Sequence, residues 1–454
     1  MPRQFRFMMT IIKTTNKQWA VSMAGVAKGI ATLVVLGVTL PFSLAAFLGA
    51  RAAVRYHPPS TAPQSRTIMI SGGKMTKALQ LARSFHGAGH RVILTETHAY
   101  RLTGHRFSKA VSGFHITPEP SDPGYIDALR QIVLTEQVNV YVPVCSPVSS
   151  VPDAVAKTAL ADLCEVIHGD VDVIRQLDDK TAFSALALEL GLSVPAFLRI
   201  THADQVKDFD FEKDRRRYIL KSVAYDPVRR LDLTPLPRET AEETAAFVDA
   251  LPISETNPWI LQEFIEGEEY CTHSTVRSGR ITLHACCRSS ASQLNYEQVD
   301  KPAMSAWADR LVNALKITGQ VSLDFIETAQ GQIYAIECNP RTHSAITMFY
   351  NHPGVSQAYL DDDAALIEPL STSRPTYWFF HELFEGLTKP WTIGARARTI
   401  ARGKEAIFEP ADPLPVLIAH HLQIPLLLLR ALRRMTPWVK IDFNIGKLVM
   451  LAGD

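Results

Sequence analysis

The hydrophobic pattern of the chain changes between its two ends. An uncharged run of 22 residues, Gly29 to Ala50, comes first and has basic residues on both sides. From Thr67 onward, short apolar runs such as T-I-M-I-S and R-V-I-L-T alternate with stretches whose apolar residues recur every three or four positions. This alternation predicts strands and helices in turn, and hence an α/β fold built on a parallel, doubly wound sheet.

The first α/β unit is expected at residues 66–177. It opens with a strand, a tight turn at Gly72 and Gly73, and a helix from Lys74 to Gly87. The turn is not a phosphate-binding P-loop, because Ile68 stands where that motif needs a glycine. Two glycines still let a ligand approach the backbone, so both are candidate substrate contacts. A purely structural turn is the alternative.

A second candidate substrate region follows the expected strand V-N-V-Y-V-P-V at residues 138–144. Cys145 and Ser146 come directly after it. Open α/β sheets bind ligands beyond the carboxyl ends of their strands. We therefore take these two residues as candidate substrate contacts.

A second unit is predicted at residues 178–360, with a lid at about 200–270. It begins with the helix D-D-K-T-A-F-S-A-L, in which an Asp caps the first turn and Lys180 lies inside it. A lysine there opposes the helix dipole unless an anion is also bound. A solvated lysine is the alternative. The short strand R-Y-I-L-K-S then carries Lys221, and W-I-L-Q-E-F-I forms another strand.

Four polar residues stand out where Q-V-S-L-D-F-I-E and Y-A-I-E-C-N-P-R are expected to form a hairpin. Glu337, Asn339 and Arg341 are spaced two apart and share a strand face. The hairpin is expected to place Asp324 opposite Ala335, with Glu337 as its diagonal neighbour. Two carboxylates can bind a small hard cation between them, and phosphate and water can complete its coordination. A guanidinium can donate two hydrogen bonds to a phosphate. Solvated strand-end charges are the alternative.

This set resembles the metal and phosphate signature of the ATP-grasp superfamily, including the thirteen positions from Asp324 to Glu337. The resemblance implies an ATP-grasp fold after the doubly wound domain, with ATP and Mg²⁺, or else Mn²⁺, as cofactors. It implies ATP contacts by Lys180, Lys221, Gln262, Glu263, Ile265 and Glu269, metal ligation by Asp324, Glu337 and Asn339, and catalytic roles for Arg341, Lys221 and Lys180.

The chain departs from the superfamily in the loop after Lys221. That loop is usually glycine-rich, but here it reads S-V-A-Y-D-P-V-R-R. We expect Arg229 or Arg230 to replace backbone amides over the phosphates.

Further segments, among them L-T-G-H-R-F-S, H-S-A-I-T-M-F-Y-N-H-P-G-V and W-V-K-I-D-F-N-I-G-K-L-V, resemble the ATP-grasp ligases of mycosporine biosynthesis. That resemblance implies joining of glycine to 4-deoxygadusol through a phosphorylated enol, with release of ADP and phosphate. His343 and Ser344 follow Arg341 directly and are candidate acceptor-site residues. Alternatives are another carboxylate–amine pair, or an ATP-binding membrane scaffold without turnover.

Charge is distributed unevenly along the chain. Residues 1–95 hold 12 Lys or Arg and no acidic residue, whereas the remainder holds 35 basic and 46 acidic residues, so +12 and −11 give the net +1. The basic excess flanks the uncharged run, which indicates a membrane surface and not nucleic acid as the partner.

Residues 1–65 are therefore interpreted as a membrane-associating segment and linker. It is expected to act as a monotopic or hairpin anchor at the cytoplasmic face, and the chain without Met1 to Arg55 is expected to be soluble and active. A single span, a signal peptide and a buried helix are the alternatives. Residues 361–454 form a C-terminal segment with an apolar, basic helix. The six cysteines have no C-x-x-C spacing, which favours buried reduced thiols over zinc. The sequence does not fix the oligomeric state.

Overall fold

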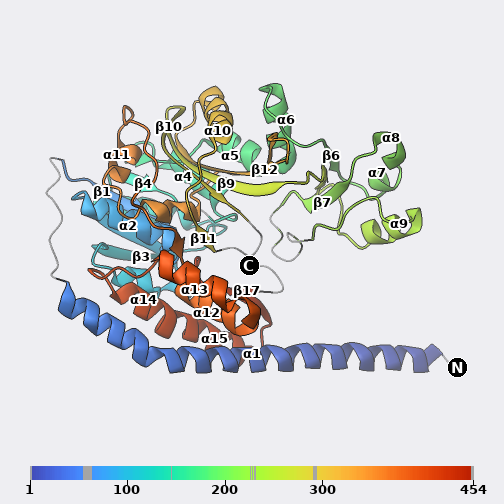
Figure 1. Ribbon diagram of the computed structural model, residues 1–454, viewed down its shortest axis with the longest axis horizontal. Coiled ribbons are helices and arrows are strands. Elements are labelled where there is room, and N and C mark those ends of the chain that lie inside the picture. Colours follow the sequence, from blue (N-terminus) through green and yellow to red (C-terminus); the bar gives the residue numbers. More distant parts are fainter. Residues whose placement is uncertain are drawn as a thin grey trace.

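The computed structural model describes residues 3–54, 64–144, 146–224, 226, 229, 232–289 and 294–450, with side chains from residue 25 onward. Figure 1 shows α/β layers, a smaller lobe that projects from them, and the long helix α1 (Arg3–Ala53) along one side. The expected Cys145 contact, the Arg230 contact and most of the linker lie outside the described residues.

A parallel sheet forms the first α/β unit. Its strand order is β3-β2-β1-β4-β5, and every neighbouring pair is parallel. The doubly wound expectation is confirmed. The central strands carry buried apolar runs, such as Ile68 to Ile70 and Val92 to Leu94, because helices cover both faces of such a sheet. Its elements are β1 (Thr67–Ile70), α2 (Thr76–Gly87), β2 (Arg91–Thr97), β3 (Gly113–Thr117), α3 (Tyr125–Glu136), β4 (Val140–Val142), α4 (Ser150–Ala159), β5 (Glu165–Val166) and α5 (Val171–Asp178).

The glycine turn after β1 is held mainly by packing. Gly72 has φ +67°, and a Cβ there would lie 2.6 Å from the Val144 carbonyl oxygen. The Gly73 amide donates to the Thr95 carbonyl at 3.0 Å, and its carbonyl lies 2.9 Å from Nδ1 of His105. Both glycines therefore have a structural reason to be present, independent of any ligand.

The projecting lobe is a small antiparallel sheet with its own apolar core. The strand order is β6-β8-β7, in which Trp259 and Leu261 of β8 are buried. This lobe occupies the segment for which we predicted a lid (Figure 1). Its elements are β6 (Phe197–Ile200), α7 (Asp204–Lys207), α8 (Phe211–Asp214), β7 (Tyr218–Ser222), α9 (Ala241–Asp249) and β8 (Trp259–Glu263).

A four-stranded antiparallel sheet connects this lobe to the body. Its order is β10-β9-β12-β13. Ser278 and Gly279 form the turn between β9 and β10, and both residues have positive φ, +50° and +79°. The elements are α6 (Lys180–Glu189), β9 (Glu268–Arg277), β10 (Arg280–Arg288), α10 (Pro302–Leu315), β12 (Gly319–Glu327) and β13 (Ile333–Asn339).

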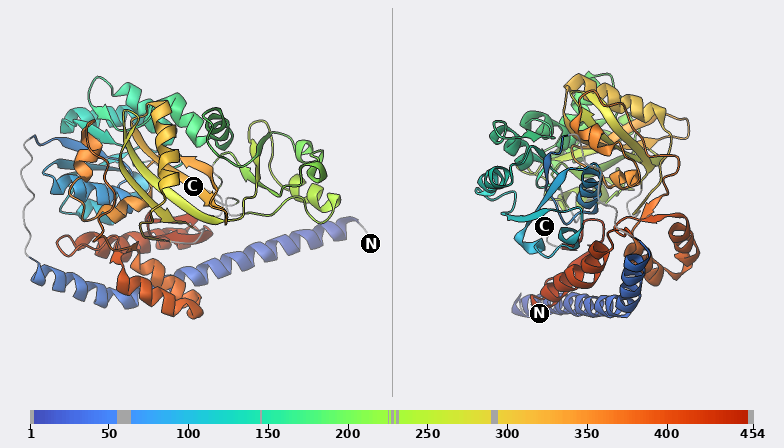
Figure 2. Two further views of the ribbon diagram at one scale, coloured as in Figure 1. Left: turned by 45° about the horizontal axis from the view of Figure 1, so that its top comes forward. Right: turned by 90° about the vertical axis from the view of Figure 1, so that its left-hand side faces the viewer.

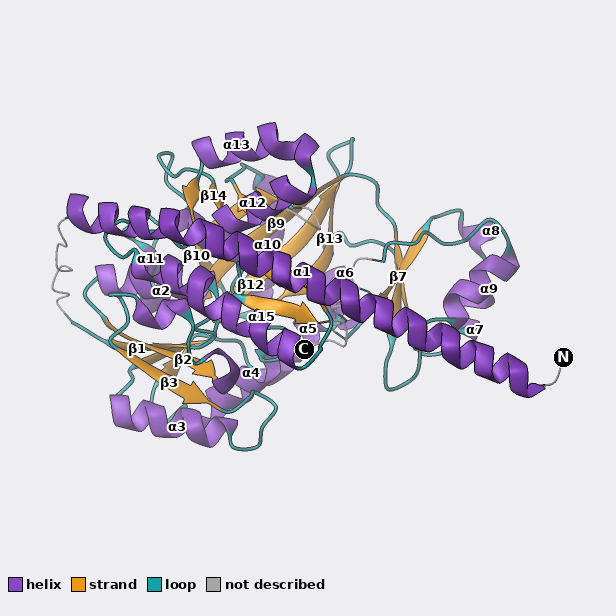
Figure 3. Cartoon of the chain, turned by 90° about the horizontal axis from the view of Figure 1, so that it is seen from below, coloured by secondary structure: helices purple, strands orange, loops and turns teal. Residues whose placement is uncertain are grey.

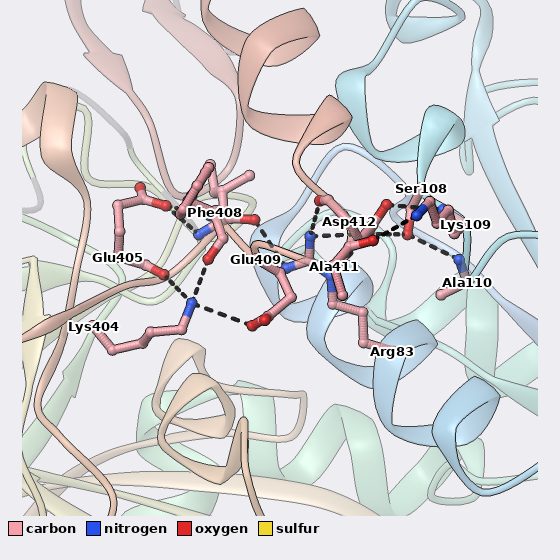
Figure 4. Close-up of polar contacts among 11 residues, drawn as sticks. Arg83, Ser108, Lys109, Ala110, Lys404, Glu405, Phe408, Glu409, Ala411 and Asp412 are labelled. Carbon is pink, nitrogen blue, oxygen red and sulfur yellow. Dashed lines mark hydrogen bonds and ion pairs between the residues drawn. The ribbon is translucent and has the colours of Figure 1, made fainter. Parts of the chain in front are cut away.

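The C-terminal segment returns to the first unit, where a cluster of polar contacts holds it (Figure 4). The Arg83 guanidinium of α2 donates to the Asp412 carboxylate at 3.0 Å, which also accepts from the Ser108 hydroxyl and the Lys109 amide. The segment's elements, with the short strand that pairs with it, are β11 (Asn295–Tyr296), α11 (Val355–Leu360), β14 (Thr376–Tyr377), α12 (Phe379–Thr388), α13 (Ile393–Arg402), β15 (Lys404–Glu405), α14 (Leu414–Ile418), α15 (Ile424–Arg433), β16 (Trp438–Asp442) and β17 (Lys447–Met450).

Helix α1 is continuous through Pro41 and lies against α15 (Figures 2 and 3). The hairpin form of the anchor is therefore wrong. Lys28 Nζ donates to the Val439 carbonyl at 2.5 Å, and the Ser43 hydroxyl lies 2.8 Å from His421 Nε2. Leu36 is 2% exposed and belongs to the main apolar core. The segment is thus more than the detachable anchor that we expected.

Two helical stretches are long and apolar enough to cross a membrane by length and composition. They are Gly25–Ala53, whose most apolar stretch is 11% buried, and Leu414–Arg433, whose most apolar stretch is 39% buried.

Candidate active site

The two carboxylates of the predicted cation site face each other across β12 and β13. Asp324 pairs directly with Glu337, whereas Phe325 pairs with Ala335, so Ile336 is an extra residue in β13. The prediction that Asp324 lies opposite Ala335 was wrong. A β-bulge adds one residue to one strand and shifts the register, and a count back from the turn cannot reveal it.

The bulge brings the carboxylates closer than predicted. Directly paired Cβ atoms lie about 4.5–5.5 Å apart, against roughly 7–8 Å for diagonal neighbours. Asn339 Nδ2 donates to Asp324 Oδ2 at 3.2 Å, which adds an amide to the same face. Burial, reinforced by the charge of Glu337, raises the pKa of Asp324 to about 8.

This donor set fits a hard divalent cation. Two buried carboxylates repel each other unless a cation lies between them, and Mg²⁺ binds one or two carboxylates while phosphate and water complete its shell. Among the described residues, no group of three or more His, Cys, Asp or Glu side chains forms a metal site. In the structure the carboxylates of Asp324 and Glu337 are the ligands that face each other, whereas the Asn339 oxygen accepts from Arg341.

Arg341 is fixed beside this pair by two acceptors. Its Nη1 donates to Asp178 Oδ1 at 2.8 Å, and its Nη2 donates to Asn339 Oδ1. Sequence reasoning gave no role to Asp178, although it is the first Asp of the D-D-K motif. An acidic residue just before a helix cap was the available signal.

The amino end of α6 forms the next wall. The Asp179 carboxylate accepts from the amides of Thr181 and Ala182 at 2.8 and 3.0 Å, so the predicted cap is confirmed. Lys180 follows, and its Nζ lies 3.7 Å from Glu337 Oε2. Asp178 thus binds Arg341, whereas Asp179 caps the helix. Lys180 lies next to the cation site.

Lys221 approaches from β7. Its Nζ donates to Gln262 Oε1 at 3.2 Å, and Gln262 Nε2 donates to the carbonyl of the bulged residue Ile336 at 3.1 Å. Desolvation by burial lowers the pKa of Lys221, and the nearby Glu337 charge opposes that effect. Gln262 therefore connects the lobe carrying Lys221 to the strand carrying Glu337.

The residues expected near adenine and ribose border the same space. The Glu263 carboxylate accepts from the Ala196 amide at 3.0 Å, so its side chain supports the backbone there. Glu269 Oε1 accepts from the Ser289 hydroxyl at 3.2 Å. Arg229 pairs with Asp226 at 3.2 Å and is not among the residues that line the cavity.

Most of the candidate residues line one cavity of about 1340 Å³. Its walls come from the first unit, the lobe, the four-stranded sheet, α1 and the C-terminal segment. Of the expected substrate contacts, Gly72 and Ser146 line it, whereas Gly73 does not. The predicted residues on its wall are Lys180, Lys221, Gln262, Glu263, Ile265, Glu269, Asp324, Glu337, Asn339, Arg341, His343 and Ser344.

The loop after Arg341 leads into the far part of this cavity. The Lys77 ammonium donates to the Thr342 carbonyl at 2.5 Å, which ties the loop to α2. His343 Nδ1 accepts from the Ala345 amide at 3.1 Å, so this ring nitrogen stabilises the turn that follows. Ser344 is 6% exposed. Its hydroxyl accepts from Nδ2 of Asn444, which lies in the turn between β16 and β17.

Comparisons with known proteins found one matching family and several similar folds. Residues 239–345 match the family described as "ATP-grasp domain". No curated protein matches the chain. The ADP complex of an N5-carboxyaminoimidazole ribonucleotide synthetase is similar over 75% of this chain and 87% of its own, at 16% identity and TM-score 0.52.

Weaker likenesses are found to two other enzymes. They are the Staphylococcus aureus N5-carboxyaminoimidazole synthetase with ADP (15% identity, 65% and 75% coverage, TM-score 0.49) and the Bacillus licheniformis L-amino acid ligase (16%, 63% and 70%, 0.49). Residues 239–345 therefore match an ATP-grasp domain, and the chain shares its fold with the synthetase that has a TM-score of 0.52.

Proposed function

We propose that this protein is an ADP-forming ligase that activates one substrate with ATP and joins it to an amine. The observation that supports this most is the convergence of Asp324, Glu337, Asn339 and Arg341 with two lysines on one cavity wall. A protein that only bound ATP would have no need for the complete set. The proposal therefore rests on geometry as well as on the domain match.

Each residue has a physical task in the proposed reaction. Lys180, Lys221 and Arg341 bind and orient the polyphosphate, and Asp324 and Glu337 would hold Mg²⁺, which neutralises charge on the transferred phosphoryl group when bound. Phosphoryl transfer depends on positioning and charge neutralisation more than on covalent help from the protein. Glu263 and Ile265 would contact adenine, and Glu269 the ribose.

For the substrates, we propose 4-deoxygadusol and glycine, which makes the protein a mycosporine-glycine synthase. The support is the resemblance of several segments outside the ATP site to the mycosporine ligases. The enol oxygen of deoxygadusol attacks the γ-phosphorus and ADP leaves. The glycine amine then attacks the ring carbon, loses a proton, and phosphate departs with the enol oxygen.

One experiment separates this proposal from its alternatives. Purified protein is incubated with ATP, Mg²⁺, deoxygadusol and glycine, and ADP release and the absorbance of the product are followed. We expect sustained ADP release only when both substrates are present. ADP release with a different carboxylate–amine pair alone would favour the other ligase, and nucleotide binding without any turnover would favour a scaffold.

We also propose that α1 lies in the plane of a membrane at the cytoplasmic face. Its outward face is a row of exposed apolar side chains, with Val34, Val38 and Phe42 at 58%, 63% and 74% exposure. Its inward face packs on α15, on α14 and on the helical residues between them, so one side of α1 faces the protein and the other faces outward. The excess of Lys and Arg in residues 1–95 suits anionic headgroups.

Vesicle flotation tests this orientation. We expect full-length protein to float with phosphatidylglycerol vesicles and the double variant Val34→Asp, Phe42→Asp to stay at the bottom. Leu198→Asp, which changes an equally apolar residue 41% exposed on the projecting lobe, is the matched control and should float. Flotation of the double variant would contradict an in-plane α1.

A further inference from the structure

The hairpin formed by β16 and β17 reaches into the cavity through its turn. Within that turn, the Asn444 carbonyl accepts from both the amide and the hydroxyl of Thr76 at 2.9 Å each. Trp378 Nε1 in turn donates to the Thr76 hydroxyl at 3.0 Å. The turn is therefore fixed to the start of α2, which holds the Asn444 side chain in a defined place.

The side-chain amide of Asn444 forms a hydrogen bond through its nitrogen but not through its oxygen. The side chain is 92% buried (8% exposed) and lines the cavity. Nδ2 donates to the Ser344 hydroxyl at 2.5 Å, whereas Oδ1 has no hydrogen-bond partner among the described residues. Buried polar atoms are nearly always hydrogen-bonded, so an unpaired buried acceptor on a residue that lines the cavity indicates a ligand.

Tyr296 completes the arrangement. Its hydroxyl group interacts with the Ser344 hydroxyl, and its ring stands edge-on to Trp378 at 5.7 Å and to His343 at 5.3 Å. Burial raises the pKa of Tyr296 well above its ordinary value, so the phenol stays neutral. We call Tyr296, Ser344 and Asn444 the turn subsite. All three line the cavity.

The turn subsite is close enough to the phosphate-binding end to hold a reacting molecule. Ser344 is three residues from Arg341, and three residues span at most about 10 Å. A ligand the size of a six-membered ring can therefore touch the turn subsite and still present an oxygen near Arg341.

The chemistry of the subsite selects the ligand class. None of its three side chains carries a charge. Two of the lysines that line the cavity are engaged, because Lys74 pairs with Glu96 at 3.2 Å and Lys77 donates to the backbone, while Lys440 and Lys447 of the hairpin also line it. Oδ1 is a neutral acceptor, which suits an alcohol O–H better than a carboxylate.

We propose that the turn subsite binds the hydroxylated ring of the substrate that receives the phosphoryl group, with Asn444 Oδ1 accepting a hydrogen bond from a ring hydroxyl. This inference rests on the proposed ligase function. It assigns a specificity role to the C-terminal hairpin, which is far from the ATP-grasp signature in the sequence. Glycine would then bind elsewhere in the cavity.

Two variants and two substrates test the assignment. Asn444→Leu removes the acceptor at similar size, and Val439→Ala leaves it in place. The variants are assayed by ADP release with 4-deoxygadusol and with cyclohexane-1,3-dione, which has the enol but no ring hydroxyl and serves as a substrate or competitive inhibitor. Val439→Ala, at an exposed position on the same hairpin, is the matched control. Calorimetry with MgADP checks that the nucleotide site is intact.

We expect Asn444→Leu to lower kcat/KM for deoxygadusol about tenfold, the effect of one lost neutral hydrogen bond, and to leave the dione within twofold. Val439→Ala should stay within threefold for both compounds. Equal losses on both compounds, or no loss, would overturn the subsite while wild-type activity still supports the ligase. A wild type that releases no ADP with deoxygadusol and glycine would remove the ligase proposal and this inference with it.

Discussion

Replacing Asp324 with asparagine should change stability and catalysis in opposite directions. Without a cation, burial and the facing Glu337 hold the pKa of Asp324 at about 8, far above the ordinary value of about 3.9. The folded protein therefore binds a proton that the unfolded chain has already lost between pH 4 and 8. Since the folded state binds more protons, stability without a cation falls as pH rises through that window.

The size of this effect follows from the shift. Each pKa unit corresponds to about 1.4 kcal/mol, so the carboxylate costs the cation-free protein on the order of 2–5 kcal/mol at pH 8, the upper value being the full shift. The asparagine side chain of the variant carries no charge at any pH. We expect Asp324→Asn to be the more stable protein at pH 8, to match wild type near pH 4, and to lack most of the slope between them.

Catalysis should respond the other way. Losing one charge contact to the transferring phosphoryl group costs about 3–4 kcal/mol, a 10²–10³ drop in turnover, and Glu337→Gln should behave alike. Urea unfolding at pH 5 and pH 8, with and without MgADP, and steady-state ADP release measure both effects. Asp309→Asn on the exposed face of α10 is the control. Turnover within tenfold of wild type, or a variant less stable than wild type at pH 8, would refute the reasoning.

Three further outcomes are expected. Arg341→Lys cannot hold both Asp178 and Asn339, so turnover should fall about 10²-fold in ADP-release assays while MgADP affinity by calorimetry changes less than threefold. Deleting residues 1–55 removes Leu36 from the core and uncovers α15, so the truncated chain should melt at a lower temperature, and unchanged melting would contradict that packing. Deoxygadusol labelled with ¹⁸O at the enol and added just before assay should pass its label to phosphate, and unlabelled phosphate beside still-labelled substrate would exclude the phosphorylated intermediate.

The hydrophobic pattern was sufficient for most of the fold. The parallel order of the first sheet followed from apolar runs that alternate with helical periods, and the Asp179 cap marked the start of α6. These features depend on local chemistry, which the sequence shows directly. The continuous course of α1 through Pro41 was not foreseen, because whether a proline ends a helix or is accommodated depends on what the helix packs against.

Local pattern found the residues of the candidate site but not their arrangement. The residue types and two-residue spacing of Glu337, Asn339 and Arg341 indicated a cation and phosphate site, yet the bulge at Ile336 changed which residue Asp324 faces. Asn444 gave no signal at all, because its role depends on a contact with Ser344, 100 residues away. Long-range contacts of this kind follow from the tertiary fold, and no local pattern predicts them.

The bulge also shows how the projecting lobe can influence the chemistry. Gln262, at 1% exposure, donates to the Ile336 carbonyl and accepts from Lys221, so one buried amide fixes both the bulged strand and the lysine that we propose to bind phosphate. Glu337 is the next residue along that strand. A movement of β8 relative to β13 would break one of these bonds and leave a buried polar group unpaired, which is costly. The spacing of the two carboxylates is therefore coupled to the position of the lobe that carries Lys221.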